Sequence, residues 1–110
     1  MTYKTFGIDA TDMLSVLGDE HSRKILIATH LKSRTAQEIA ENHGIPIAAC
    51  YRRIKLLEDM AFIQKDEQIL TQKGKRRWTY TSNVNKIELS YMDGKMAAMC
   101  ELRNGFVEQN

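Results

Sequence analysis

TAQEIAENHGIPIAACYRRIKLLEDMAFI, residues 35–63, predicts two helices joined by a very short turn. Thr35 followed three residues later by Glu38 is a capping box, so we expect a helix to begin directly after Thr35. Gly44 should end this helix, because glycine adopts positive φ angles without steric cost. Pro46 suits the first turn of the next helix, where its missing N–H has no partner to lose.

The second of these helices, expected to reach Asp59 or Met60, has two chemically different faces. Ala40 is small enough to let the two helices cross closely. Apolar residues at helical spacing should fill the space between them. These residues are Ile39, Ile45, Cys50, Ile54 and Leu57. The residues expected on the opposite, outer face are Ala48, Ala49, Tyr51, Arg52 and Lys55.

This outer face has the chemistry of a helix-turn-helix, here over 35–60, whose second helix presents its N-terminal half to the major groove of DNA. Ala48 and Ala49 permit close approach and contact with a thymine methyl group. Arg52 is long enough to donate two hydrogen bonds to guanine. The residues that suit phosphate contacts are Tyr51, Arg53 and Lys55. The alternative is a plain helical pair with a solvated outer face.

The charge of the chain is concentrated in one central block. The whole chain has 16 basic and 14 acidic residues, a net charge of +2. Residues 51–77 hold eight basic and four acidic residues, a net of +4, whereas 1–50 and 78–110 each have a net of −1. A local basic block of this kind can bind a polyanion. The alternative is a solvated surface without a partner.

Two further helices are predicted before residue 35. Apolar residues at helical spacing indicate a short helix from Asp9 or Thr11 to Leu17. Asp19 is a candidate N-cap for a second helix, with the sequence EHSRKILIATHL. The core residues expected in that helix are Ile25, Leu26 and Leu31.

After Met60 the pattern changes from helical to extended. The segments AFIQKD and QILTQ predict two short strands that pair around Asp66 and Glu67. The segment RRWTYTS is rich in aromatic and β-branched residues and predicts another strand. Trp78 and Tyr80 should share a face of that strand, where packing in the core or in a dimer is favoured over stacking on bases.

KIELSYMDGKMAAMCEL, residues 86–102, predicts a β-hairpin, because Asp93-Gly94 is a strong type I′ turn dipeptide. The register that follows pairs Tyr91 with Met96, Leu89 with Ala98, Ile87 with Cys100, and Lys86 with Glu101. The first three pairs are apolar and share one face, and the fourth joins opposite charges on the other face. The alternative is a helix over 95–103, since Ala, Met, Leu and Glu are good helix formers.

The segment MLSVLGDEHSRKILIATHL resembles the opening of the ArsR-type winged-helix repressors, in which an Asp-x-x-x-Arg segment precedes an Ile-Leu pair. The matching residues are Asp19, Arg23, Ile25 and Leu26. Residues 35–63 resemble the helix-turn-helix of that family and the start of its wing, so the similarity covers about residues 11–81. The tail RRWTYTSNVNKIELSYMDGKM is similar to small archaeal winged-helix proteins, in which a Tyr-x-Ser segment leads into a strand pair around Asp-Gly.

The resemblance implies a β-hairpin wing after the recognition helix. This hairpin would lie between Phe62 and about Leu70, with Lys65 near its tip, in a wing region of about 61–81. The basic residues that it implies for the DNA backbone or the minor groove are Lys65, Lys73, Lys75, Arg76 and Arg77; the alternative is that they only solubilise short strands. Family members usually bind DNA as dimers through their terminal segments, here the first helix and the C-terminal hairpin. The apolar face of that hairpin can instead cover the core of its own domain.

The residue inventory argues against other classes of function. Many ArsR-type proteins sense metals through a Cys-x-Cys pair or through clusters of His and carboxylates, and this sequence departs from both patterns; His21, His30 and His43 lack ligand spacing. Cys50 falls on the predicted buried face, which leaves Cys100 as the better redox candidate. We find no catalytic motif, and we expect no metal, cofactor or small-molecule ligand and no enzyme activity.

Two cysteines, no secretory signal and no apolar run of membrane-spanning length predict a reduced, cytoplasmic chain. The sequence therefore predicts a single α+β domain over 1–110, a winged helix-turn-helix with an additional C-terminal hairpin. The expected function is sequence-specific binding of double-stranded DNA by a homodimer that regulates transcription through promoter occupancy. The alternative is a protein–protein interaction module of the transcription machinery, which would carry apolar surface where DNA would bind.

Overall fold

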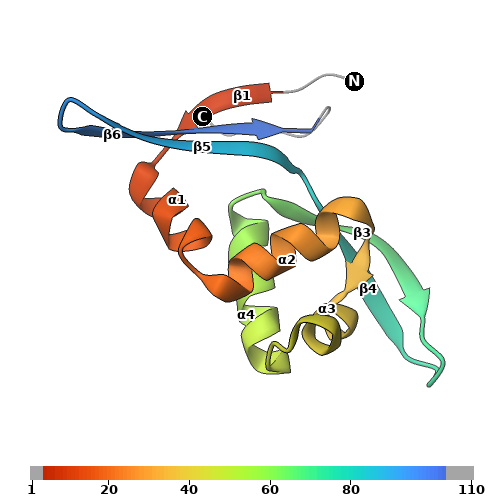
Figure 1. Cartoon of the computed structure of the whole chain (residues 1–110). Coiled ribbons are helices and arrows are strands. Elements are labelled where there is room, and N and C mark those ends of the chain that lie inside the picture. The colour runs from red at the N-terminus through yellow and green to blue at the C-terminus, as the bar shows by residue number, and fades with distance from the viewer. Residues whose placement is uncertain (1–3, 104–110) are drawn as a thin grey trace.

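The computed structural model describes residues 4–103, which form four helices and two three-stranded antiparallel sheets (Figure 1). The helices are α1 (Ala10–Leu17), α2 (Glu20–Leu31), α3 (Ala36–His43) and α4 (Ile47–Asp59). The strands are β1 (Lys4–Ile8), β2 (Arg34–Thr35), β3 (Ile63–Leu70), β4 (Arg76–Ser82), β5 (Val84–Met92) and β6 (Lys95–Leu102). The α+β class expected from the sequence is therefore confirmed.

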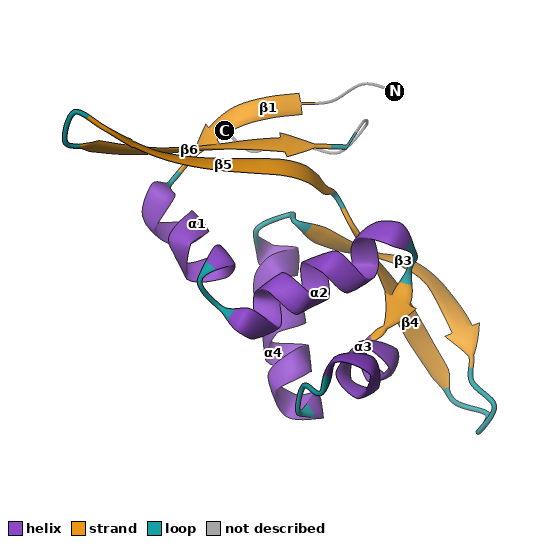
Figure 2. Ribbon diagram, viewed as in Figure 1, coloured by secondary structure: helices purple, strands orange, loops and turns teal. Residues whose placement is uncertain are grey.

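The two sheets lie at different ends of the molecule. One has the strand order β1-β6-β5 and the other the order β2-β4-β3. Figure 2 shows the first sheet next to α1, the helices α2, α3 and α4 grouped together, and the β3–β4 hairpin projecting away from them. The chain passes directly from β4 into β5, so the body and the C-terminal hairpin are connected without a linker.

Side-chain caps fix the starts of three helices at the residues that the sequence indicates. The Asp9 carboxylate accepts a hydrogen bond from the backbone N–H of Thr11, at 2.8 Å, at the start of α1. Asp19 caps α2 in the same way. At α3, Thr35 and Glu38 form the predicted capping box, with distances of 3.1 and 2.9 Å for its two hydrogen bonds.

The core is one buried cluster to which all four helices and the strands β3, β4 and β6 contribute, and it includes the inter-helix residues expected from the sequence. Those residues are Ile39, Ala40, Ile45, Cys50, Ile54 and Leu57. The prediction that Leu31 is a core residue is wrong, because its side chain is 89% exposed. Leu31 lies four residues after Ile27 on the solvent face of α2, whereas Ile25 and Thr29 lie on the buried face.

The prediction of a turn at Asp66 and Glu67 is wrong, because β3 runs without a break from Ile63 to Leu70 and pairs with β4. The pairing is irregular between Lys65 and Gln68, and the Thr79 hydroxyl bridges this bulge by bonding both the N–H and the C=O of Glu67. The chain turns instead over residues 71–75, where Gly74 has a φ of +77°. Gly74 supplies the positive φ of this turn without steric cost, whereas Asp66 and Glu67 lie within β3.

The predicted C-terminal hairpin is confirmed with its register. Tyr91 pairs with Met96, Leu89 with Ala98, Ile87 with Cys100 and Lys86 with Glu101. Asp93 and Gly94 both have positive φ, as a type I′ turn requires. Residues 95–102 are therefore a strand, and the helical alternative is wrong, because pairing across this turn outweighs the helix propensity of Ala and Met. The sequence analysis did not identify β1 or the two-residue β2.

Candidate nucleic-acid interface

Helix α4 is held against the body by one face and leaves the other open. Gly44, with a φ of +65°, ends α3, and Pro46 occupies the N-cap position of α4. On the inner face, Cys50, Ile54 and Leu57 are all buried, and the Cys50 thiol donates to the Ala36 carbonyl at 3.5 Å. The turn and this packing together fix the direction in which the outer face of α4 points.

Four of the residues predicted for the outer face of α4 are exposed, namely Ala48, Tyr51, Arg52 and Lys55. The prediction for Ala49 is wrong, because its side chain is buried at 8% exposure. Ala49 precedes Cys50 and lies one turn before Arg53 on the side of α4 that faces the body. The sequence analysis also missed Ile47, which is 45% exposed in the first turn of α4.

Arg53 is engaged within the protein rather than free at the surface. Its guanidinium donates two hydrogen bonds to the Asp19 carboxylate, at 2.8 and 3.1 Å. This pairing holds the pKa of the Asp19 carboxyl well below its usual range, because the guanidinium stabilises the charged form. The predicted phosphate contact of Arg53 stays a prediction, while the ion pair shows a direct structural role, which is to tie α4 to the start of α2.

Lys55 forms an ion pair along its own helix, with its ammonium 3.0 Å from the Asp59 carboxylate. The hydrogen bond to Asp59 raises the pKa of Lys55. Both side chains are mostly exposed, so the pair contributes little to stability and a phosphate can compete for the ammonium. Within residues 9–103, no ion pair involves Arg52.

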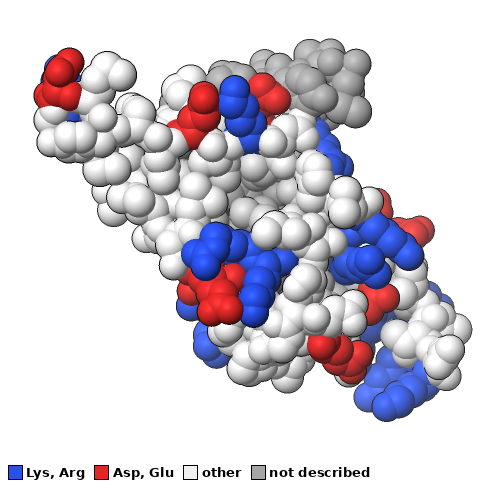
Figure 3. Space-filling view, in the orientation of Figure 1, with Lys and Arg blue, Asp and Glu red and all other residues white. Residues whose placement is uncertain are grey.

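The basic residues of the β3–β4 hairpin lie at or next to its turn, except Lys65. Lys73 and Lys75 lie in the turn itself, and Arg76 and Arg77 begin β4 directly after it. Figure 3 shows lysine and arginine atoms gathered at this end of the molecule. The prediction that Lys65 lies near the tip is wrong, because it pairs with Tyr80 near the base of the hairpin. Its ammonium lies 5.5 Å from the centre of the Trp78 ring, a cation–π contact.

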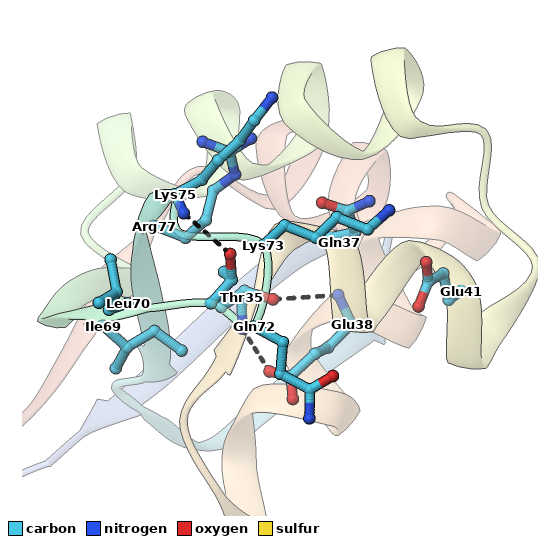
Figure 4. A pocket seen from close by; sticks show the side chains of 11 residues that line it. Thr35, Gln37, Glu38, Glu41, Ile69, Leu70, Gln72, Lys73, Lys75 and Arg77 are labelled. Atoms are coloured by element: carbon cyan, nitrogen blue, oxygen red, sulfur yellow. Dashed lines mark hydrogen bonds between the residues drawn. The ribbon is translucent and has the colours of Figure 1, made fainter.

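A groove of about 570 Å³ separates α3 from the turn of the β3–β4 hairpin (Figure 4). Its walls carry Gln37, Glu38 and Glu41 from α3 and Lys73, Lys75 and Arg77 from the hairpin. Figure 4 shows the Lys75 and Arg77 side chains extending in the same direction from β4 and the turn before it. Sequence analysis missed Gln37, although its position two residues after a capping Thr marks it as exposed at a helix start.

Burial limits what the aromatic and cysteine residues singled out in the sequence can do. Tyr80 is buried, which raises the pKa of its phenol, and Trp78 is 39% exposed, so the two do not form one open stacking surface. Cys100 is buried, and this burial raises the pKa of its thiol to about 11. A thiol in that state is a poor nucleophile, so the view of Cys100 as a redox candidate finds no support.

The described part of the chain lacks two further features. Residues 4–103 hold no cluster of three or more His, Cys, Asp or Glu side chains placed to bind a metal ion. In the same part of the chain, no helix combines the length and the apolar character that a membrane span requires.

Comparison with known proteins does not assign the chain to a family. No family model matches the sequence. No curated protein matches it at a significant level either.

Proposed function

We propose that this chain is a winged helix-turn-helix protein that binds double-stranded DNA in a sequence-specific way and regulates transcription by occupying promoters. In this proposal α3 and α4 are the helix-turn-helix, α4 is the recognition helix, and the β3–β4 hairpin is the wing. The observation that carries the proposal is the division of α4 into a buried apolar face and an exposed face with Tyr51, Arg52 and Lys55.

The chemistry of that exposed face fits DNA in two ways. Arg52, which has no ionic partner in the described residues, can donate two hydrogen bonds to the O6 and N7 atoms of guanine. Ala48 precedes it by one turn and has no bulk that would keep the helix out of a major groove. The wing residues Lys73, Lys75 and Arg76 contribute charge for phosphates, which gives affinity without sequence preference.

The direct test is fluorescence anisotropy with a duplex from the gene's own upstream region and a scrambled duplex of equal length. We expect the native duplex to bind more tightly, with an affinity that falls steeply as salt increases, because phosphate contacts release counterions. Equal binding of both duplexes would contradict sequence specificity, and the absence of binding at low salt would contradict the proposal altogether.

Two variants separate the roles of the helix and the wing. Arg52→Ala should lose about 1–3 kcal/mol of preference for the native over the scrambled duplex, which is the typical contribution of a bidentate base contact. Lys75→Ala should lower the affinity for both duplexes by the same factor, because a phosphate contact does not depend on the base sequence. Equal losses on both duplexes for both variants would contradict this assignment of roles.

A second candidate function, docking onto a protein of the transcription machinery, is favoured by one observation. Ile27 and Leu31 are 66% and 89% exposed, and they line a groove of about 210 Å³ with Ile39 and Arg34. This groove lies on α2 and α3 and not on the outer face of α4. It can therefore serve a protein partner in addition to DNA, and Leu31→Lys should leave DNA affinity unchanged.

A further inference from the structure

The outer end of the β5–β6 hairpin extends past the rest of the molecule. Strand β1 pairs with β6 only from Ala98 to Leu102, so among the described residues the sheet has two strands beyond that point. We call residues 89–97 the distal arm. Figure 1 shows it projecting past α1, and an isolated two-stranded ribbon of this kind is only marginally stable in water.

The apolar face of the hairpin continues along the distal arm without a cover. Three cross-strand pairs follow one another on this face: Ile87 with Cys100, Leu89 with Ala98, and Tyr91 with Met96. The first two pack against the core, whereas Tyr91 is 74% and Met96 48% exposed. Contiguous exposed apolar side chains of this kind mark an interaction surface.

The open edge of β5 indicates what kind of partner fits. β5 is the last strand of its sheet, so one row of its backbone N–H and C=O groups has no strand partner within residues 4–103. Proteins protect such edges with charges or proline. Here Lys86 and Glu88 lie near the body, but from Leu89 to Met92 the edge carries no charge. Figure 3 shows the arm as an uncharged surface up to the charged turn at its end.

We infer that the chain forms a homodimer by antiparallel pairing of β5 with β5 of a second copy, with Leu89 on the two-fold axis. A two-fold interface needs a surface that complements itself. This register places Leu89 opposite Leu89 and Ile87 opposite Tyr91, so every pair on the inner face is apolar. On the outer face it places Lys86 opposite Met92 and Glu88 opposite Ser90, so no like charges oppose each other directly.

The arrangement also covers the residues that the single chain leaves open. The two-fold axis of an antiparallel strand pair is perpendicular to the sheet, so both helical bodies lie on the same side of one six-stranded sheet. Each distal arm then extends alongside the body of the other copy, and the apolar side chains of Tyr91 and Met96 face it. Leu14 of α1, which is 45% exposed, adds apolar surface on the body side. The inference does not depend on DNA binding.

The mass of the full chain in solution, measured by sedimentation velocity over a concentration series, tests the inference. We expect twice the chain mass for the wild type and the single-chain mass for Tyr91→Lys, whose exposed side chain is not needed for the fold. Leu31→Lys, at a still more exposed apolar position on α2, is the matched control and should stay dimeric. A monomeric wild type, or a dimer that persists in Tyr91→Lys, would overturn the inference.

Cross-linking tests the register itself. Residues opposite each other in an antiparallel pair have Cα atoms about 4.5–5.5 Å apart, within the range that a disulfide spans. Leu89→Cys should therefore form a covalent dimer under mild oxidation, and Leu31→Cys should not. A chain without residues 104–110 should still dimerise; if that truncation alone removes the dimer, the terminal segment and not the β5 edge is the interface, which overturns the inference.

Discussion

The Asp19 carboxylate both caps α2 and pairs with Arg53. It caps α2 by accepting a hydrogen bond from the Ser22 N–H at 2.8 Å, and it accepts two more from the Arg53 guanidinium. The side chains of Asp19 and Arg53 are only 27% and 32% exposed, so this pair is better shielded from water than the Lys55–Asp59 pair. The recognition helix of the proposed function is thus oriented by a residue that does not itself face DNA.

Replacement of Asp19 should separate these two contributions. Asp19→Asn keeps the cap, because asparagine is an equally good N-cap, and loses the ion pair, which should lower the free energy of unfolding by about 1 kcal/mol. Asp19→Ala loses both and should cost about 2 kcal/mol. Urea denaturation at neutral pH measures the two values. An unchanged stability of Asp19→Asn would show that the ion pair contributes nothing, and equal losses in both variants would show that the cap contributes nothing.

The same pair predicts a pH dependence with a definite sign. The pKa of Asp19 is lower in the folded chain than its ordinary value of 3.8. The ion pair therefore stabilises the fold above about pH 4 and ceases to do so as the carboxylate becomes protonated at lower pH. The difference in unfolding free energy between the wild type and Asp19→Asn should shrink below pH 4. A difference that stays constant into that range would contradict the role of the charge.

The helices α3 and α4 both end at a residue in the left-handed conformation. α3 ends at Gly44 and α4 ends in a Schellman motif, in which the Phe62 N–H bonds the Leu57 carbonyl at 2.9 Å and the Ala61 N–H bonds the Glu58 carbonyl at 2.9 Å. The residue at the left-handed position of that motif is Ala61, with a φ of +65°. Glycine is the usual residue there, so α4 ends with a backbone strain that α3 avoids.

Exchange of the residue type at these two ends should change stability in opposite directions. Gly44→Ala meets no neighbouring atom within 4 Å, so its only cost is the left-handed conformation, about 1 kcal/mol. Ala61→Gly removes that same strain and should raise the free energy of unfolding, by up to about 1 kcal/mol. Thermal denaturation of both variants beside the wild type measures the effect. Changes of the same sign would contradict this account of the two helix ends.

The basic surface and the uncharged surface of the distal arm lie in different parts of the molecule. The basic residues gather on α4 and on the β3–β4 hairpin, whereas the distal arm of β5–β6 is uncharged between residues 89 and 92. A surface for a polyanion and an apolar surface for a second copy can therefore be occupied at the same time. If the proposed dimer forms, it brings the two proposed recognition helices to one DNA duplex.

This separation predicts how dimerisation and DNA binding are linked. A dimer contacts about twice as many phosphates as a single chain, so the slope of log affinity against log salt should be about twice as steep. Anisotropy with the native duplex should therefore give about half the wild-type slope for Tyr91→Lys, while Leu31→Lys keeps the full slope. If Tyr91→Lys is monomeric and its slope is nevertheless unchanged, DNA is bound by one copy at a time.

Local patterns of sequence were sufficient for much of the fold. The capping box at Thr35, the left-handed Gly44 and the Asp93-Gly94 turn each encode a backbone conformation within a few residues. The helix bounds, the register of β5 with β6, and the buried face of α4 follow from them, because hydrogen-bonded turns and side-chain periodicity are short-range properties. The outer face of α4 was predicted correctly at four of its five residues for the same reason.

Contacts between distant parts of the chain determined the rest. Arg53 and Asp19 are 34 positions apart, and only the packing of α4 on α2 brings them together. Ala49 is buried because the body extends further around α4 than helical periodicity indicates. Leu31 is exposed because it lies with Ile27 on the face of α2 that the rest of the described chain leaves uncovered. β1 joins its sheet through pairing with β6, nearly a hundred residues away, and no local pattern carries that information.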